Sequence, residues 1–269
     1  MSNLYDFVYC IDKNFNHQVY LSIASLLETN QTRKFSVNII HKQPKTFNKY
    51  MKNLNKIFPE QELNLIEFKY RIKNYPNLKR AHVSEATYYR MFIEDHVQNP
   101  ADFLAYIDAD AYFLKDIDSK FINIIDNLRD KNLLIAAKTE FDSSNKNYTE
   151  VFERLDLDQK YFNAGVIIIN TKKWKVDNIS KNLKEKVFEL NEKIKFWDQD
   201  VLNSIINGKY YELPFELNYL VDINFEENLE EKKVEIVHYA GKIKPWTKRG
   251  IKLNPNTYYQ KLYTSYSLK

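Results

Sequence analysis

Apolar runs alternate with amphipathic stretches over the first 70 residues. Three runs, at Leu4–Ile11, Phe35–Ile40 and Leu63–Phe68, have the length and the β-branched or aromatic content of buried strands. Between them, Gln18–Glu28 and Phe47–Phe58 carry apolar residues at helical spacing. This order predicts a βαβαβ unit, which is half of a nucleotide-binding sheet whose ligands bind at the carboxyl ends of the parallel strands.

The remainder of the chain continues this alternation without a repeat or a low-complexity linker. Further strands are expected at Phe103–Ile107, Leu133–Ala137, Val166–Ile169 and Val234–Val237, and further helices at Ile179–Leu190 and Gln199–Asn207. The simplest division is one α/β domain, residues 1–241, followed by a terminal extension, residues 242–269.

The composition limits the chemistry that this domain can use. With 269 residues, 44% of them hydrophobic, the chain can bury a substantial core. Only 4 glycines occur and none builds a glycine-rich phosphate loop, so phosphate must be held by a metal or by cationic side chains. The single cysteine, Cys10, excludes an intramolecular disulfide and a cysteine-rich zinc site. Because it suits a reducing compartment, and because no signal peptide or long apolar segment is found, we expect a cytoplasmic protein.

Positive charge is concentrated at the end of the chain. Residues 242–269 contain seven lysine and arginine residues and no acidic one, whereas the whole chain has a net charge of +4. Aromatic residues alternate with these cations, so the segment is a candidate for docking on anionic lipid, which would make the protein peripheral to the inner face of the cell membrane. A solvated helix with core aromatics is the alternative. Residues 1–241 contain no basic stripe, so nucleic acid is not an expected partner.

Two aspartates at the end of an apolar strand give the strongest local signal. The chain contains 17 aspartates and four D-x-D pairs, of which about one is expected by chance. Only Asp108 and Asp110 follow five residues without a charge, Phe103–Ile107, where burial would make unpaired carboxylates costly. In an extended chain residues i and i+2 point to the same side, so both carboxylates can converge on one hard cation that bridges diphosphate oxygens.

Three further segments combine polar side chains with predicted elements. Asn163 and Gly165 open an apolar run, where an amide can bind sugar hydroxyls close to the backbone, although a turn into a core strand would look the same. The acidic residues of Phe196–Asp200 open a helix, where capping alone would explain them. His238 follows the predicted strand Val234–Val237, and its imidazole can bind a metal while the lysines after it meet phosphate.

In order, spacing and residue types, these four segments resemble the retaining glycosyltransferases of family 8, especially the bacterial lipopolysaccharide α-galactosyl- and α-glucosyltransferases. The resemblance extends over residues 4–246. It implies a GT-A fold, which is an α/β domain with a Rossmann-like N-terminal half and a mixed central sheet. It also implies a UDP-galactose or UDP-glucose donor, Mn²⁺ as the metal, and a glycan or glycolipid acceptor in surface polysaccharide synthesis.

The resemblance also implies roles for individual residues. The metal ligands that it implies are Asp108, Asp110 and His238, with Ala109 as the middle residue of the motif beside the donor. The catalytic pair beside the anomeric carbon is Asp198 and Gln199. The other donor contacts are Asp12 and Asn14 at the uridine, Arg90 and Asn163 at the sugar, and Gly241 and Lys244 at the diphosphate.

Departures from the family pattern and rival functions leave the acceptor open. Lys13 replaces an acidic residue, and Glu140 stands where relatives often have an aspartate on the acceptor side. We expect front-face attack with retention, because the amide of Gln199 is neutral and a poor nucleophile for a covalent route. The rivals are an aspartyl phosphatase, which does not explain the other three segments, a self-glucosylating or protein-modifying glucosyltransferase, and a non-enzymatic carbohydrate-binding protein.

Overall fold

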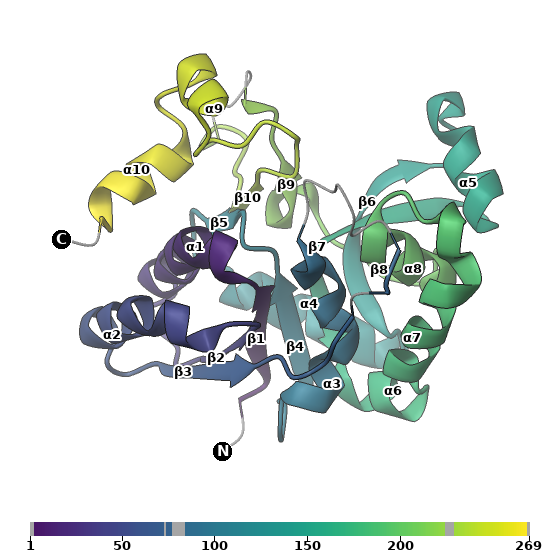
Figure 1. Ribbon diagram of the computed structural model, residues 1–269, viewed down its shortest axis with the longest axis horizontal. Coiled ribbons are helices and arrows are strands. Elements are labelled where there is room, and N and C mark those ends of the chain that lie inside the picture. Colours follow the sequence, from purple (N-terminus) through teal and green to yellow (C-terminus); the bar gives the residue numbers. More distant parts are fainter. Residues whose placement is uncertain (1–2, 73, 77–83, 224–228, 268–269) are drawn as a thin grey trace.

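A seven-stranded sheet forms the centre of the protein in this computed structural model, which describes residues 3–72, 74–76, 84–223 and 229–267 (Figure 1). The strand order is β3-β2-β1-β4-β7-β6-β8. Four neighbouring strands are parallel, namely β1 (Tyr5–Ile11), β2 (Ser36–His41), β3 (Glu62–Glu67) and β4 (Phe103–Ile107). The others make the sheet mixed: β7 (Lys160–Asn170) is antiparallel to β4 and β6 (Ile135–Asp142), and β8 (Tyr211–Glu212) is parallel to β6. The predicted βαβαβ unit is confirmed.

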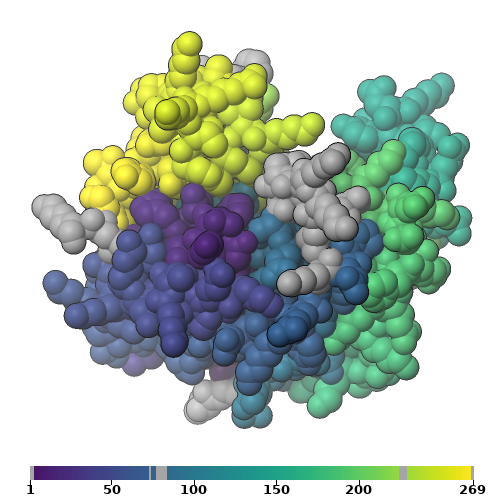
Figure 2. Space-filling view, viewed as in Figure 1, coloured from purple at the N-terminus to yellow at the C-terminus, as the bar shows by residue number. Residues whose placement is uncertain are grey.

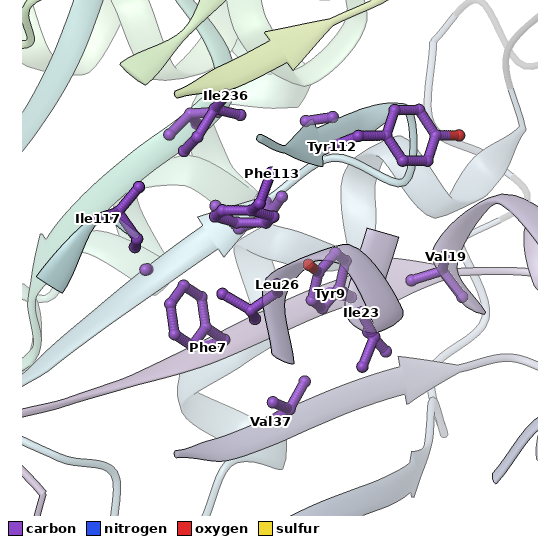
Figure 3. Packing of buried hydrophobic residues seen from close by; sticks show 14 of the residues in the cluster. Phe7, Tyr9, Val19, Ile23, Leu26, Val37, Tyr112, Phe113, Ile117 and Ile236 are labelled. Atoms are coloured by element: carbon purple, nitrogen blue, oxygen red, sulfur yellow. The ribbon is translucent and has the colours of Figure 1, made fainter. Parts of the chain in front are cut away.

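Alternate residues of β1 point to opposite faces of the sheet, and each face carries its own core. Phe7 and Tyr9 belong to the first core, where Ile23 and Leu26 of α1 face them (Figure 3). The helices that contribute to this core are α1 (Asn16–Thr29), α2 (Asn48–Ile57), α4 (Asp118–Asp130) and, from the end of the chain, α10 (Tyr258–Ser265).

The second core lies on the other face of the sheet and receives Val8 and Cys10 from β1. The helices that contribute to it are α3 (Ile93–His96), α5 (Thr149–Leu155), α6 (Thr171–Val176), α7 (Ile179–Leu190) and α8 (Trp197–Ile206). Short 3-10 helices join the elements, at η1 (Lys13–Phe15), η2 (Pro44–Phe47), η3 (Glu85–Phe92), η4 (Lys146–Tyr148), η5 (Asn191–Lys193) and η6 (Phe215–Leu217). Because both faces are covered, the strands read as nearly continuous apolar runs in the sequence.

A smaller sheet brings a distant segment to the carboxyl end of β4. It contains β5 (Ala111–Phe113), β10 (Ile236–His238) and β9 (Tyr219–Leu220), in the order β5-β10-β9. β10 runs antiparallel to β5, and His238 lies opposite Ala111. Since β5 begins directly after Asp110, this pairing sets His238 beside the two aspartates.

Three strands depart from their predicted boundaries by two residues or more, whereas β1, β2 and β3 differ by one residue at one or both ends. β6, predicted as Leu133–Ala137, continues past a bulge to Asp142. β7, predicted as Val166–Ile169, begins at Lys160, because residues 160–163 pair with this extension of β6. β10 begins two residues later than predicted, since the amide of Val234 closes a turn instead of pairing with a strand.

The end of the chain folds into two helices, α9 (Lys248–Leu253) and α10 (Tyr258–Ser265), and α10 lies against α1 (Figures 1 and 2). Tyr259 and Leu262 of α10 are buried in the first core. Several aromatic residues of the basic segment therefore stabilise the fold. The predicted boundary after residue 241 stays a prediction. None of the described helices is long and apolar enough to cross a membrane.

Candidate active site

Two carboxylates and an imidazole converge where β4 ends. Asp108 and Asp110 occupy the turn between β4 and β5, and His238 ends β10. One ligand atom from each of the three lies within 4.8 Å of the others. Nε2 of His238 is 3.3 Å from Oδ1 of Asp110 and 3.8 Å from Oδ2 of Asp108. The structure therefore brings the three predicted metal ligands together, although His238 follows the two aspartates by about 130 residues in the sequence.

Gly165 makes room for the imidazole. A Cβ atom at this position would lie 2.1 Å from Cε1 of His238, so no larger residue fits beside the ring. The carbonyl of Gly165 also accepts a hydrogen bond from the amide of Asp108, at 2.7 Å. The glycine of the Asn163–Gly165 segment is thus required by the packing of the site and not by a turn.

A chain of amides determines which nitrogen of His238 carries the proton. Oδ1 of Asn163 accepts the backbone N–H of Gly165 and an N–H of Asn218, both at 3.0 Å. The orientation of the Asn218 amide is thereby fixed, and its Oδ1 lies 2.9 Å from Nδ1 of His238. Nδ1 must donate to that oxygen, so the lone pair of Nε2 points to Asp108 and Asp110. One imidazole nitrogen and two carboxylates form a ligand set that suits a divalent metal ion.

Lys244 lies on the other side of Asp110. Its Nζ is 2.6 Å from Oδ2 of Asp110 and 2.6 Å from the carbonyl of Tyr239. Burial raises the pKa of the Asp110 carboxyl, but Lys244 and His238 together outweigh it and hold that pKa well below its usual range. The carboxylate form of Asp110 is thus favoured, and the ammonium group of Lys244 lies beside the predicted metal ligands.

Arg90 connects Asp108, a predicted metal ligand, to Asp198, the predicted catalytic aspartate. Its guanidinium is buried over the ring of Tyr106, at 3.9 Å from the ring centre. One nitrogen, Nη2, lies 3.0 Å from Oδ1 of Asp108, and Nε lies 2.5 Å from Oδ2 of Asp198. The hydroxyl of Thr87 donates to the other oxygen of Asp198. Burial raises the pKa of Asp198 to about 6, against the lowering effect of Arg90.

Gln199 is held by three partners on neighbouring strands. Its Oε1 accepts the backbone N–H of Ala164 at 2.9 Å. Its Nε2 donates to Oε2 of Glu140 and to the hydroxyl of Tyr161, both at 3.2 Å. The backbone amide fixes the orientation of the side chain, because only an oxygen can accept from it. Asp200, one residue on, caps the start of α8 by accepting the amides of residues 195 and 196.

The remaining predicted donor contacts lie at the same edge of the sheet but outside this network. The carboxylate of Asp12 caps η1 by accepting the amide of Asn14, which is exposed. Ala109 is half-buried between the two metal-ligand aspartates. Gly241 is exposed, and a Cβ there would meet nothing within 4 Å, so packing does not require its glycine.

Other D-x-D pairs have structural roles. Asp118 forms an ion pair with Arg33 and accepts the hydroxyl of Tyr5. Asp156 ends α5 in the left-handed conformation.

Residues that the sequence did not single out complete the site. Asn218 follows η6 without any sequence signal, whereas Tyr106, two residues before Asp108, shares its side of the strand and could have been found by period-two spacing.

Comparison with known proteins decides the family. The model of glycosyl transferase family 8 matches residues 6–250. The chain belongs to this family. It is therefore a glycosyltransferase with a GT-A fold, and the interpretation drawn from four sequence segments is confirmed.

Glycosyltransferases from several bacteria are similar to this chain. The lipopolysaccharide 1,2-glucosyltransferase of Escherichia coli is 29% identical over 255 residues, which cover 88% of this chain and 71% of that protein. The lipopolysaccharide 1,3-galactosyltransferase of Salmonella typhimurium is also 29% identical over 255 residues, which cover 90% of this chain and 73% of that protein. Glycosyltransferase GlyA of Streptococcus pneumoniae is 28% identical over 235 residues, and the match spans only 30% of its length.

Solved structures show the same fold. The crystal structure of galactosyltransferase LgtC, in complex with donor and acceptor sugar analogs, superimposes with a TM-score of 0.79 at 19% identity. The superposition covers 98% of this chain and 97% of that one. Because nearly the whole chain is included, α9 and α10 lie within the region of similarity, whereas at this identity the likeness concerns the fold alone.

Proposed function

We propose that this family 8 glycosyltransferase moves galactose or glucose from a UDP-sugar to a hydroxyl group of a glycan or glycolipid acceptor, with retention at the anomeric carbon. The observation that supports it best is the convergence of Asp108, Asp110 and His238, connected through Arg90 to Asp198. The two lipopolysaccharide glucosyl- and galactosyltransferases that resemble the chain support a hexose donor and a role in surface glycan synthesis.

The residues around Asp110 suit a nucleoside diphosphate and its cation. Asp108, Asp110 and His238 would hold Mn²⁺, which supplies Lewis-acid stabilisation of the diphosphate leaving group when it is bound. Lys244 brings a second positive charge to the same place, so the leaving phosphate need not be protonated first. Asp12 and Asn14 would contact the uridine, and Ala109 and Gly241 would border the donor without adding charge.

Front-face attack agrees with how the candidate nucleophiles are held. Both oxygens of Asp198 are occupied, by Thr87 and by Arg90, and its side chain is only 2% exposed. Gln199 offers a neutral amide whose oxygen already accepts the amide of Ala164. We therefore assign both residues to orienting the donor sugar and stabilising the charge on its ring, while the departing phosphate oxygen takes the proton of the acceptor hydroxyl. A glycosyl adduct on either residue in intact-mass spectra would contradict this route.

Metal-dependent release of UDP tests the proposal. Purified protein is incubated with UDP-galactose, UDP-glucose and their N-acetyl analogues, with and without Mn²⁺. We expect release from at least one hexose donor that requires the metal and that Asp110→Ala abolishes. Asp116→Ala is the matched control, because Asp116 also belongs to a D-x-D pair but is exposed and accepts the backbone amide of Asp118 at the start of α4. Metal-independent release, or none from any donor, would reject the function. Mass gain with UDP-glucose alone would instead support a self-glucosylating protein.

The basic end of the chain supports a location in the cytoplasm at the inner face of the membrane. Lys248, Arg249 and Lys252 on α9 are exposed, and Ile251 and Leu253 beside them are 43% and 45% exposed. Cations next to exposed apolar side chains suit an anionic lipid surface. Truncation would remove core residues of α10, so charge reversal of the three cations is the sharper experiment. We expect it to abolish binding to phosphatidylglycerol vesicles and leave UDP release intact; unchanged binding would reject membrane docking.

A further inference from the structure

Three aromatic rings form a stack that leads outward from Gln199. The ring of Phe141 lies parallel to that of Tyr161, with centres 4.6 Å apart and planes at 8°, and parallel to that of Tyr148, at 4.1 Å and 5°. The inner ring, Tyr161, accepts a hydrogen bond from Gln199. Phe141 and Tyr161 are buried, whereas Tyr148 is 38% exposed. The stack thus ends on an exposed ring that is anchored to the reaction centre.

Tyr148 is held in place before any ligand arrives. Phe141 covers one face of its ring, and the ring belongs to η4, which Asn145 caps by accepting the amide of Asn147. Binding to such a ring costs little side-chain entropy, because few rotamers remain to be lost. An exposed, rigid aromatic face beside an active site is therefore a binding surface and not merely an unburied hydrophobic residue.

Polar side chains surround this ring on the same loop. The exposed residues next to Tyr148 are Asp142, Ser143, Ser144, Asn145, Lys146 and Asn147. Their amides, hydroxyls and carboxylate can pair with the hydroxyl groups of a sugar. A pyranose combines a C–H face, which packs on an aromatic ring, with a rim of hydroxyls. A flat aromatic ring within a polar loop matches both the C–H face and the hydroxyl rim. A lipid tail has no hydroxyl groups, so it would not use the polar side chains of the loop.

Glu140 connects the loop to the site of transfer. Its Oε2 accepts from Gln199 and from Asn163, and its Oε1 has no hydrogen-bond partner among the described residues. The free oxygen of this exposed carboxylate can accept a hydroxyl of an incoming acceptor. Phe141 is the residue after Glu140, so one short segment of the chain connects Glu140 to Tyr148.

We propose that Tyr148 is a stacking platform for an outer sugar ring of an oligosaccharide acceptor of at least two residues. The proposal rests on the transfer reaction proposed above, since it requires the reacting hydroxyl near Glu140 and Gln199. Two ring spacings separate Tyr148 from Tyr161, which suits the reach of a disaccharide better than that of a monosaccharide.

Acceptor preference tests the platform. The donor that releases UDP fastest is offered with lactose, maltose and cellobiose, and with galactose and glucose as single-sugar acceptors. We expect wild-type protein to favour a disaccharide, and Tyr148→Ala to lower kcat/KM for that disaccharide about fivefold to tenfold through KM, the size of one aromatic contact. Transfer to the monosaccharide and hydrolysis of the donor should not change. Tyr148→Phe should behave as wild type, as should Phe188→Ala, which removes an even more exposed ring on α7 (56% exposed against 38% for Tyr148).

The outcomes separate the two proposals. A disaccharide preference that survives in Tyr148→Ala overturns the platform, and so does a wild-type protein that hydrolyses donor but neither binds nor uses any of the three disaccharides. Absence of metal-dependent UDP release from every donor contradicts the transfer reaction instead. Should Tyr148→Ala lose donor hydrolysis, Tyr148→Leu replaces it, because leucine still covers Phe141 without offering a flat face.

Discussion

Nδ1 of His238 donates to Oδ1 of Asn218 at 2.9 Å, which leaves Nε2 free to face Asp108 and Asp110. Asn218→Leu keeps the volume but removes this acceptor, so the ring is free to turn or to change tautomer. We expect the Mn²⁺ concentration for half-maximal UDP release to rise about 10- to 100-fold, as is usual when the hydrogen-bond partner of a metal-binding histidine is lost.

Asn218→Asp is the matched variant, because it retains an oxygen for His238 while it replaces the donor to Asn163 with a carboxylate oxygen. Its metal requirement should lie much closer to that of the wild type. Equal requirements in Asn218→Leu and wild-type protein, measured by Mn²⁺ titration of UDP release and by calorimetry, would show that Asn218 does not orient the imidazole.

Gly165→Ala should damage the site and the fold together. Its Cβ would lie 2.1 Å from Cε1 of His238, and a buried ring that ends β10 cannot withdraw without breaking that strand pairing. We expect a loss of about 1–3 kcal/mol in the free energy of unfolding, together with weakened Mn²⁺ binding. Gly241→Ala is the control for stability, since its Cβ meets nothing within 4 Å. Urea unfolding curves that coincide for both variants would contradict the packing argument.

Much of the parallel half of the fold could be predicted because three of its four strands, β1, β2 and β4, are buried on both faces. Phe103–Ile107 is an unbroken apolar run, and only Asp6 interrupts Tyr5–Ile11. The charge-free run before Asp108 also distinguished the D-x-D pair that lies beside His238 from three others. The antiparallel half was harder to predict, because residues 160–163 pair with the end of β6 and several side chains of these two segments are polar. Because Lys160 and Asn163 interrupt the apolar pattern, the sequence did not predict that β7 begins at Lys160.

The contacts of Asn218 and Arg90 within the site could not be predicted from spacing. Asn218 orients His238 from a two-residue strand edge that has no periodicity to detect. Arg90 was expected beside the donor sugar, yet its nitrogens engage Asp108, Asp198 and a backbone carbonyl. Such relationships depend on how two sheets meet, which local patterns do not encode. The contact of Arg90 with the donor stays a prediction.

The pH dependence of transfer should report Asp198. Burial raises its pKa to about 6, so the carboxylate that pairs with Arg90 gains a proton as the pH falls below that value. We expect kcat/KM to fall about tenfold per pH unit below 6 and to be flat above it. Asp198→Asn should be much less active and should lack this limb of the profile. If Asp198→Asn still showed the fall in kcat/KM below pH 6, that fall would belong to another titrating group, such as a metal ligand.

His41 should make the folded state sensitive to mild acid. Its side chain is buried, with Nε2 donating to Oδ1 of Asn16 at 2.7 Å and Nδ1 accepting the amide of Gln43 at 2.8 Å. Burial lowers the pKa of His41 from 6.5 to about 4. Between these values the unfolded chain binds the proton more readily, so the stability that neutral His41 contributes is complete above pH 6.5 and is lost as the pH falls towards 4.

Comparison with His41→Gln isolates this group from the carboxylates that titrate nearby. Glutamine can still donate to Asn16 but does not titrate. We expect the free energy of unfolding of the wild type to fall between pH 7 and pH 5 by up to about 1.4 kcal/mol per unit more than that of His41→Gln. Urea unfolding at the two pH values measures the difference. Parallel losses in the two proteins would mean that His41 titrates normally in the folded state, and its buried bonds to Asn16 and Gln43 would then not exist in solution.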